Sequence, residues 1–279
     1  MRRLGPSLLL LSIMAVLPAG PMAAGASDPE APIRLGVLAK RGEAQCSRQW
    51  GPTAEYLTRS LPGRRVELVP LPFDRLEEGV AEGRIDFMLA NPSYYAQMAV
   101  RHGVSRMITW KNARAHRACT RFGGVLFCRA DREDLRAVRD LLWTRLLAVD
   151  ERSFGGWQAV LRELRDAGIE PRSQCSSVAF AGTHDAVVRA VQRGEADFGI
   201  VRSDTLECMA EEGLIRPDDF RVIVLNEEHH EPDFPFLHST RLYPEWPMAR
   251  LEHTDPELAE HVAAALLNMP ADHEAARAA

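Results

Sequence analysis

The strongest constraint on the fold of this chain is an internal repeat. The stretch VAEGRIDFMLANPSYY, residues 80–95, has a counterpart in VQRGEADFGIVRSDTL, residues 191–206, and the two align without a gap at an offset of 111 residues. Each copy contains the end of a helical pattern, a glycine, a short apolar run and polar residues that begin another helix. We therefore predict two similar lobes, each of which presents the same strand-to-helix corner to a shared cleft.

Strand and helix patterns alternate on both sides of this repeat. In the first half the apolar run IRLGVLA (33–39) precedes the helical spacing of 49–61, and in the second half RLLAVD (145–150) precedes the helical spacing of 154–168. Alternation of this kind predicts βαβ units around mostly parallel sheets. The predicted fold class is α/β, with two lobes that are each a mostly parallel sheet flanked by helices, and with two strands that cross between the lobes.

The last part of the chain has weaker patterns. Residues 220–226 and 235–243 have the composition of extended segments, and DPELAEHVAAALLNM (255–269) has the spacing of an amphipathic helix that packs back on the first lobe. The predicted domains are residues 27–116 with 226–279 for the first lobe and residues 117–225 for the second.

The N-terminus has the pattern of a secretory signal peptide. Arg2 and Arg3 precede an apolar run from Leu8 to Leu17, and an A-x-A cleavage pattern follows at 24–26. The apolar run is about half of the roughly 20 residues that a membrane-spanning helix needs. We predict that residues 1–26 are removed and that the mature chain is periplasmic, without insertion into the membrane.

The charge and the cysteine pattern argue against nucleic-acid, metal and cofactor binding. The net charge is −5, and no basic stripe with interleaved aromatic residues is present, so nucleic acid is not an expected partner. A negative net charge does not exclude an anionic ligand, because binding depends on local donors. The five cysteines form no C-x-x-C pattern, and the histidine- and acid-rich segment 226–238 fits no helical or finger ligand spacing. We expect neither a metal nor a cofactor.

Three corners between strand and helix patterns have residues suited to binding an anion. Ligands of parallel sheets lie outside the carboxyl ends of the strands, where helix N-termini present free N–H groups. A serine followed by glycine amides can form an anion-binding nest in which a ligand approaches the backbone closely. The candidate residues are Ser93, Tyr94 and Tyr95 in ANPSYY, Ser153, Phe154, Gly155 and Gly156 in DERSFGGWQ, and Thr183 and His184 in AGTHDAVV. Three such corners predict a shared oxyanion site.

These motifs resemble one protein family. GTHDAVVRAVQRGEADFGIVRSDTLE, VAEGRIDFMLANPSYY and DERSFGGW are similar to motifs of the phosphonate/phosphate-type periplasmic solute-binding proteins, which have the type II, two-lobed Venus-flytrap architecture. PLPFD (70–74), FGGVLFCRADR (122–132) and FLHSTRLYPEWP (236–247) resemble a sub-branch that forms the sensing domain of tetrathionate-sensor-like histidine kinases. The resemblance covers about residues 33–270.

The resemblance implies an oxyanion held between the lobes by a tyrosine, a hydroxyl-rich helix start, a histidine and acidic residues. By position these functions fall on Tyr94 or Tyr95, on Ser153, on His184 with Thr183, and on the corner that contains Arg202, Ser203 and Asp204. The chain departs from the family where Phe154-Gly155-Gly156 replaces a hydroxyl-dense run and where Arg202 adds a cation. We expect Arg202 to favour a purely anionic ligand, such as a phosphate or a sulfur oxyanion.

The resemblance implies a protein that captures a small anionic ligand without catalysis. The closed form would be recognised by the membrane subunits of an ABC importer or by a sensor histidine kinase. Two alternatives stay open on the sequence: a thiol-based enzyme that uses Cys46 or Cys128 on a sulfur compound, and a docking surface at 239–247. The pairing of the cysteines is also open, with Cys119 and Cys128 as one candidate pair, and so is the question of whether the chain is part of a longer sensor.

Overall fold

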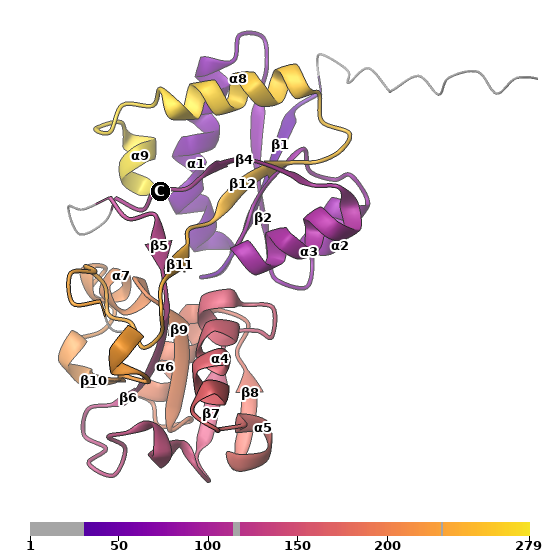
Figure 1. Cartoon of the computed structure of the whole chain (residues 1–279). Coiled ribbons are helices and arrows are strands. Elements are labelled where there is room, and N and C mark those ends of the chain that lie inside the picture. Colours follow the sequence, from indigo (N-terminus) through magenta and orange to yellow (C-terminus); the bar gives the residue numbers. More distant parts are fainter. Residues whose placement is uncertain (1–30, 114–117, 230) are drawn as a thin grey trace, which may run out of the picture.

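The chain folds into two α/β lobes that lie one above the other in Figure 1. The computed structural model describes residues 31–113, 118–229 and 231–279. The predicted signal peptide lies outside the described residues. Within them, no helix is long and apolar enough to cross a membrane.

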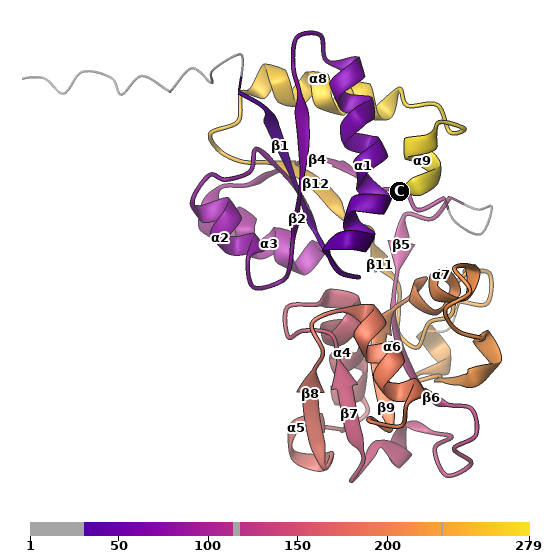
Figure 2. The same ribbon diagram turned by 180° about the vertical axis from the view of Figure 1, so that it is seen from behind.

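The first lobe is built on a five-stranded sheet with the strand order β2-β1-β3-β12-β4. Its strands are β1 (Ile33–Leu38), β2 (Val66–Leu71), β3 (Phe87–Leu89), β4 (Ser105–Thr109) and β12 (Pro247–Arg250). Its helices are α1 (Glu43–Ser60), α2 (Leu76–Ala81), α3 (Pro92–His102), α8 (Pro256–Leu267) and α9 (Glu274–Ala278). In both views α1, α8 and α9 lie on one side of the sheet and α2 and α3 on the other (Figures 1 and 2).

The second lobe has a sheet of the same size with the strand order β10-β6-β9-β7-β8. Its strands are β6 (Gly124–Arg129), β7 (Arg145–Ala148), β8 (Ser177–Phe180), β9 (Phe198–Arg202) and β10 (Phe220–Ile223). Its helices are α4 (Ala159–Asp166), α5 (Pro171–Gln174), α6 (His184–Gln192) and α7 (Thr205–Glu211), and a π-helical turn, η3 (Phe154–Gln158), leads directly into α4.

The sheets are mixed, because each adds antiparallel strands to a parallel core. β1 pairs in parallel with β2 and β3, and β7 pairs in parallel with β8 and β9. β12 runs antiparallel to β3, and β6 runs antiparallel to β9. The prediction of mostly parallel sheets therefore describes the two βαβ cores. In each sheet the strand that directly follows a crossing, β6 or β12, runs the opposite way.

The sequence repeat encodes one structural unit twice. Asp86 lies just before β3, and its carboxylate accepts hydrogen bonds from the backbone N–H and the guanidinium of Arg34 at 2.6 and 3.3 Å. Asp197, just before β9, accepts the same two bonds from Arg145 at 2.9 and 3.0 Å. In each lobe the aspartate fixes the start of its strand beside the adjacent parallel strand, β1 or β7. The two segments that align in sequence therefore also make equivalent hydrogen bonds.

Two short strands connect the lobes. β5 (Arg121–Phe122) and β11 (Tyr243–Pro244) pair antiparallel on the crossing segments, as Figure 1 shows between the two sheets. Ser239 joins the second sheet, because its N–H donates to the Gly124 carbonyl at 2.8 Å and its hydroxyl accepts from the Leu126 N–H at 2.8 Å. These bonds favour a return crossing at β11, and the domain boundary at residues 225 and 226 stays a prediction.

Of the segments predicted at the end of the chain, one strand and one helix are present in the structure. Residues 220–223 form β10, whereas only Tyr243 of the segment 235–243 lies in a strand. The helix predicted at 255–269 is α8, and it packs on α1, where the Tyr56 hydroxyl donates to the Ala265 carbonyl at 3.0 Å. The largest cluster of buried apolar side chains runs from the first lobe into the second, so the lobes are in contact.

Candidate functional site between the lobes

The carboxyl ends of parallel strands from both lobes meet at the contact between the lobes. The His184 N–H, at the start of α6, donates to the carbonyl of Lys40, which follows β1, at 3.0 Å. The Asn91 side-chain amide, after β3, donates to the Arg152 carbonyl, after β7, at 3.3 Å. This is the edge of the sheets at which α/β proteins bind ligands.

Each of the three predicted corners is a helix start with a side-chain cap. The Asn91 side chain accepts a hydrogen bond from the Tyr94 N–H at 2.9 Å, the Ser153 hydroxyl accepts from the Gly156 N–H at 3.1 Å, and the Thr183 hydroxyl accepts from the Ala186 N–H at 3.2 Å. Capping holds the first helical turn in place, and the earlier amides of such a turn have no partner within the helix. The positive ends of α3, η3 and α6 therefore face the region where the lobes meet.

His184 lies at the contact between the lobes, where its surroundings favour the neutral imidazole. Its side chain is buried, and Nδ1 accepts a hydrogen bond from the Arg202 N–H at 3.2 Å. Burial, followed by repulsion from Lys40 and Arg202, holds the pKa of His184 well below its ordinary value of 6.5. Because Nδ1 accepts, the proton of the neutral ring is assigned to Nε2, which makes Nε2–H a donor.

Arg202 is compensated within the protein. Its guanidinium donates to both carboxylate oxygens of Glu245 at 2.6 and 3.2 Å and lies 3.2 Å from the carboxylate of Asp204. The side chain is 2% exposed, and it lies over the Phe122 ring at 4.4 Å. Two buried carboxylates therefore already compensate the charge of Arg202, and the expectation that Arg202 favours a purely anionic ligand stays a prediction.

Lys40 is a functional candidate that the motifs did not indicate. Its ammonium group lies 3.7 Å from the Asp204 carboxylate and 5.4 Å from the ring centres of Trp110 and Trp246. Burial, and then repulsion from Arg202, lower the pKa of Lys40 from 10.5 to about 8. A basic residue immediately after the first buried strand was the available signal, since that position lies at the ligand-binding edge of a parallel sheet.

Lys40, Arg202, Asp204 and Glu245 together form what we call the inter-lobe charge cluster. It contains two cations and two carboxylates, and all four side chains are buried. Asp204 also accepts a hydrogen bond from the Asn112 side chain at 2.9 Å. The resemblance assigns Asp204 to ligand contact. In this structure its carboxylate is already bonded to Lys40, Arg202 and Asn112.

The first corner divides into core and surface. Tyr94 is 1% exposed, and its hydroxyl donates to the Phe73 carbonyl at 2.9 Å, so it belongs to the core of the first lobe. Ser93 and Tyr95 are partly exposed at the start of α3. Of the two tyrosines, Tyr95 is the one whose side chain is accessible from outside that core.

The second corner is shaped by packing. A Cβ atom on Gly155 would lie 2.5 Å from the Cβ of Arg202, and one on Gly156 would lie 2.5 Å from a methyl group of Val149. The glycines are therefore required by close approach of neighbouring protein atoms, in addition to any ligand. Phe154 is partly buried and packs edge-on against the rings of Phe122 and Tyr243, at centroid distances of 5.8 and 4.7 Å.

A small cavity of about 10 Å³ lies beside Lys40, close to the minimum that holds one water molecule. Its lining residues are Leu38, Lys40, Arg41, Cys46, Gln49, Trp50, Trp110 and Trp246.

Burial raises the pKa of the Cys46 thiol to about 12 and also raises the pKa of the buried Cys128. A thiolate is the reactive form of cysteine, so the burial of both thiols disfavours the thiol-based enzyme.

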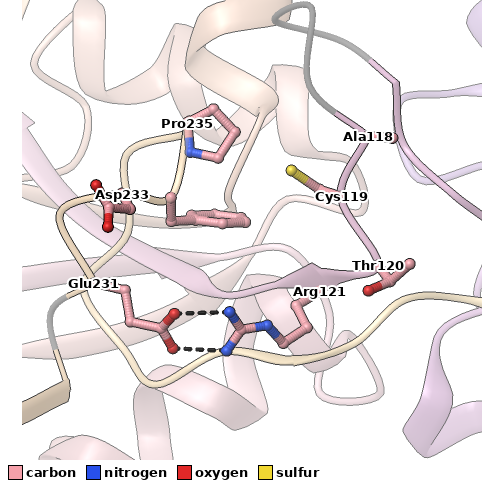
Figure 3. Close-up of a pocket in the computed structure, with 8 residues that line it drawn as sticks. Ala118, Cys119, Thr120, Arg121, Glu231, Asp233 and Pro235 are labelled. Atoms are coloured by element: carbon pink, nitrogen blue, oxygen red, sulfur yellow. Dashed lines mark hydrogen bonds and ion pairs between the residues drawn. The ribbon is translucent and has the colours of Figure 1, made fainter.

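A larger recess of about 220 Å³ lies beside the crossing strand β5 and is shown in Figure 3. Arg121 points across it and is held by Glu231 through two hydrogen bonds of 2.8 Å. The cationic group of the recess is thus already paired. Among the described residues, no group of three His, Cys, Asp or Glu side chains is placed to hold a metal ion.

Comparison with known proteins identifies the family. Residues 35–279 match the family described as "ABC transporter, phosphonate, periplasmic substrate-binding protein". The tetrathionate sensor histidine kinase TtrS of Salmonella typhimurium is 31% identical over 239 residues, which are 85% of this chain and 39% of that protein. The chain thus spans about two fifths of the length of this relative.

Solved structures of low sequence identity share the fold. PhnD1 from Prochlorococcus marinus, in complex with methylphosphonate, aligns with a TM-score of 0.72 at 15% identity and covers 90% of this chain and 88% of its own. A binding protein component of an ABC phosphonate transporter from Pseudomonas aeruginosa aligns with a TM-score of 0.72 at 13% identity, over 89% of this chain and 78% of its own. The predicted two-lobed type II architecture and the predicted resemblance are confirmed, and the chain belongs to the phosphonate-type periplasmic substrate-binding proteins.

Proposed function

We propose that this chain captures a small oxyanion between its lobes in the periplasm and does so without catalysis. The candidate ligands are phosphate- or phosphonate-like anions and sulfur oxyanions such as tetrathionate. The closed form would be recognised by the membrane subunits of an ABC importer or by a sensor histidine kinase. Export would use residues 1–26 as a signal peptide, and the lobes would divide near residues 116 and 226.

The observation that carries this proposal is the convergence of capped helix starts from both lobes. Asn91 with Arg152, and His184 with Lys40, bring the positive ends of α3, η3 and α6 to one contact region. Backbone amides at helix starts, with the Nε2–H of His184, are donors that suit an anion. Ser93, Tyr95, Ser153 and Thr183 lie at these starts and would surround the ligand.

The cations between the lobes already have carboxylate partners, which favours binding of an anion by neutral hydrogen-bond donors. Arg202 is neutralised by Glu245 and Asp204, and Lys40 lies beside Asp204. An oxyanion would therefore be held mainly by hydrogen bonds from amides, hydroxyls and imidazole, which gain strength when closure excludes water. The relatives agree with this class, since one structure contains methylphosphonate and one relative is a tetrathionate sensor.

A thermal-shift screen followed by calorimetry tests the proposal. The panel contains phosphate, phosphite, methylphosphonate, sulfate, thiosulfate and tetrathionate, and a ligand that binds the native state raises the melting temperature. We expect at least one member to raise it and to bind reversibly. If no member of the panel shifts the melting temperature, the oxyanion assignment is wrong.

A substitution at His184 locates the site. In His184→Asn, the side-chain oxygen occupies the place of Nδ1 and still accepts from the Arg202 N–H, whereas the Nε2–H donor is lost. Loss of one hydrogen bond to a charged ligand predicts about a tenfold or larger rise in Kd. His261→Asn on the exposed face of α8 is the matched control and should bind like the parent protein. Unchanged affinity in His184→Asn would remove His184 from the site.

A further inference from the structure

Arg41 links the two lobes more extensively than any candidate ligand residue described above. It follows β1 in the first lobe, and its guanidinium donates to both carboxylate oxygens of Asp185 in α6 at 2.6 and 3.0 Å. It also donates to both carboxylate oxygens of Glu212, at the end of α7, at 2.7 and 2.7 Å. The side-chain amide of Gln45, in α1, adds a bond to Glu212 at 2.9 Å.

The burial of Arg41 gives these bonds an energetic weight that surface ion pairs lack. The Arg41 side chain is 6% exposed, although Asp185 and Glu212 are 27% and 30% exposed. The guanidinium uses its planar donor fork on two carboxylates at once, which is the geometry in which arginine pairs most strongly. Because the carboxylates are partly exposed, solvent screening lowers the free energy that these pairs contribute. The buried guanidinium, in contrast, has little water to replace a lost carboxylate.

The partners of Arg41 belong to two helices of the second lobe. α6 and α7 both follow strands of the second sheet, and they pack on each other. Separation of the lobes would therefore break the bonds to Asp185 and Glu212 in one step. Rearrangement within one lobe would not replace them, because Arg41 lies on the other lobe.

We infer that Arg41, with Asp185 and Glu212, is a latch that holds the lobes closed independently of a bound ligand. In this role Arg41 is a positioning residue that sets the ratio of closed to open molecules. The larger this ratio is without ligand, the less binding free energy a ligand spends on closing the lobes. A protein whose lobes are partly closed beforehand binds more tightly, and it also presents the closed form to a partner at low ligand concentration. The inference does not depend on the identity of the ligand.

Small-angle X-ray scattering of the protein without added ligand tests the latch. Arg41→Gln removes the charge and two of the three donor nitrogens, and we expect the ratio of closed to open molecules to fall at least about tenfold, seen as a larger radius of gyration. Arg34→Gln is the matched control, since Arg34 makes a similar bond set to Asp86 within the first lobe. It should leave the radius of gyration unchanged.

A second variant separates opening from misfolding. Asp185→Asn with Glu212→Gln keeps Arg41 and nearly the same side-chain shapes, and it should open the lobes in the same way as Arg41→Gln. Circular dichroism and the melting temperature report whether each variant is folded. If the folded variants scatter like the parent protein, the latch does not exist, whatever the oxyanion screen shows.

Discussion

At the scale of single residues, Glu207 is a carboxyl group whose pKa is raised by its surroundings. Oε1 accepts a hydrogen bond from the Leu237 N–H at 2.6 Å, and Oε2 is buried without a hydrogen bond to any described residue. Burial, partly offset by that bond, raises the pKa of Glu207 from 4.5 to about 7. The folded protein therefore keeps a proton that the unfolded chain releases between these values, so the free energy of unfolding falls as pH rises from about 4.5 to 7.

Glu207→Gln should remove this dependence. A glutamine still accepts from the Leu237 N–H but carries no charge, so the variant should be more stable than the parent at pH 7.5 by up to roughly 3 kcal/mol and show a flatter profile below pH 7. Urea unfolding at pH 5, 6, 7 and 8 measures this. Glu260→Gln on exposed α8 is the control. Parallel profiles for the parent and Glu207→Gln would contradict the shifted pKa.

Residues whose partners are near in sequence were predictable, and those with distant partners were not. Asn91 and Thr183 cap helices through amides three residues ahead, so the sequence indicates both. The ion pair between Arg202 and Glu245 spans 43 residues, and no local pattern predicts it. Lys40 differs, because its place directly after β1 was a local signal that the motifs did not use.

At the scale of elements, η3 depends on glycine for its approach to β9. Gly155→Ala would place a methyl group 2.5 Å from the Arg202 Cβ and 3.0 Å from the Phe122 ring. Overpacking of this kind costs about 1–3 kcal/mol, so urea unfolding should show a loss of that size. Gly79→Ala in α2 is the control: the added atom meets a flexible Leu71 methyl at 3.2 Å, and the helix gains propensity, which predicts a change within about 1 kcal/mol. Equal stability of the two variants would contradict the packing argument.

Elements with a complete local signal were predicted, and elements defined by their neighbours were not. β1, β3, β7 and β9 are buried apolar runs bounded by turn residues, and α1 and α6 carry helical spacing. The two-residue strands β5 and β11 exist because the crossing segments pair with each other. Their direction, and the antiparallel place of β12, follow from where the chain returns, which sequence periodicity does not encode.

At the scale of the whole molecule, Glu245 connects the returning crossing to the second lobe. It lies between β11 and β12, is 1% exposed, and pairs with Arg202 at the end of β9. Its backbone N–H also donates to the Thr120 carbonyl at 2.8 Å on the outgoing crossing. The backbone and side chain of one residue thus connect both crossing segments to the sheet that carries Arg202.

Glu245→Gln should therefore destabilise the molecule as a unit. The glutamine preserves the volume but leaves the buried Arg202 with Asp204 as its remaining carboxylate, and loss of one partner of a buried pair costs about 3–5 kcal/mol. Urea unfolding followed by tryptophan fluorescence and by circular dichroism should show a lower midpoint in both signals. Glu67→Gln, which breaks the exposed pair with Arg65, should cost about 1 kcal/mol or less. If Glu245→Gln cost no more than Glu67→Gln, the inter-lobe charge cluster would contribute specificity of arrangement without net stability, as buried ion pairs do where apolar packing can replace them.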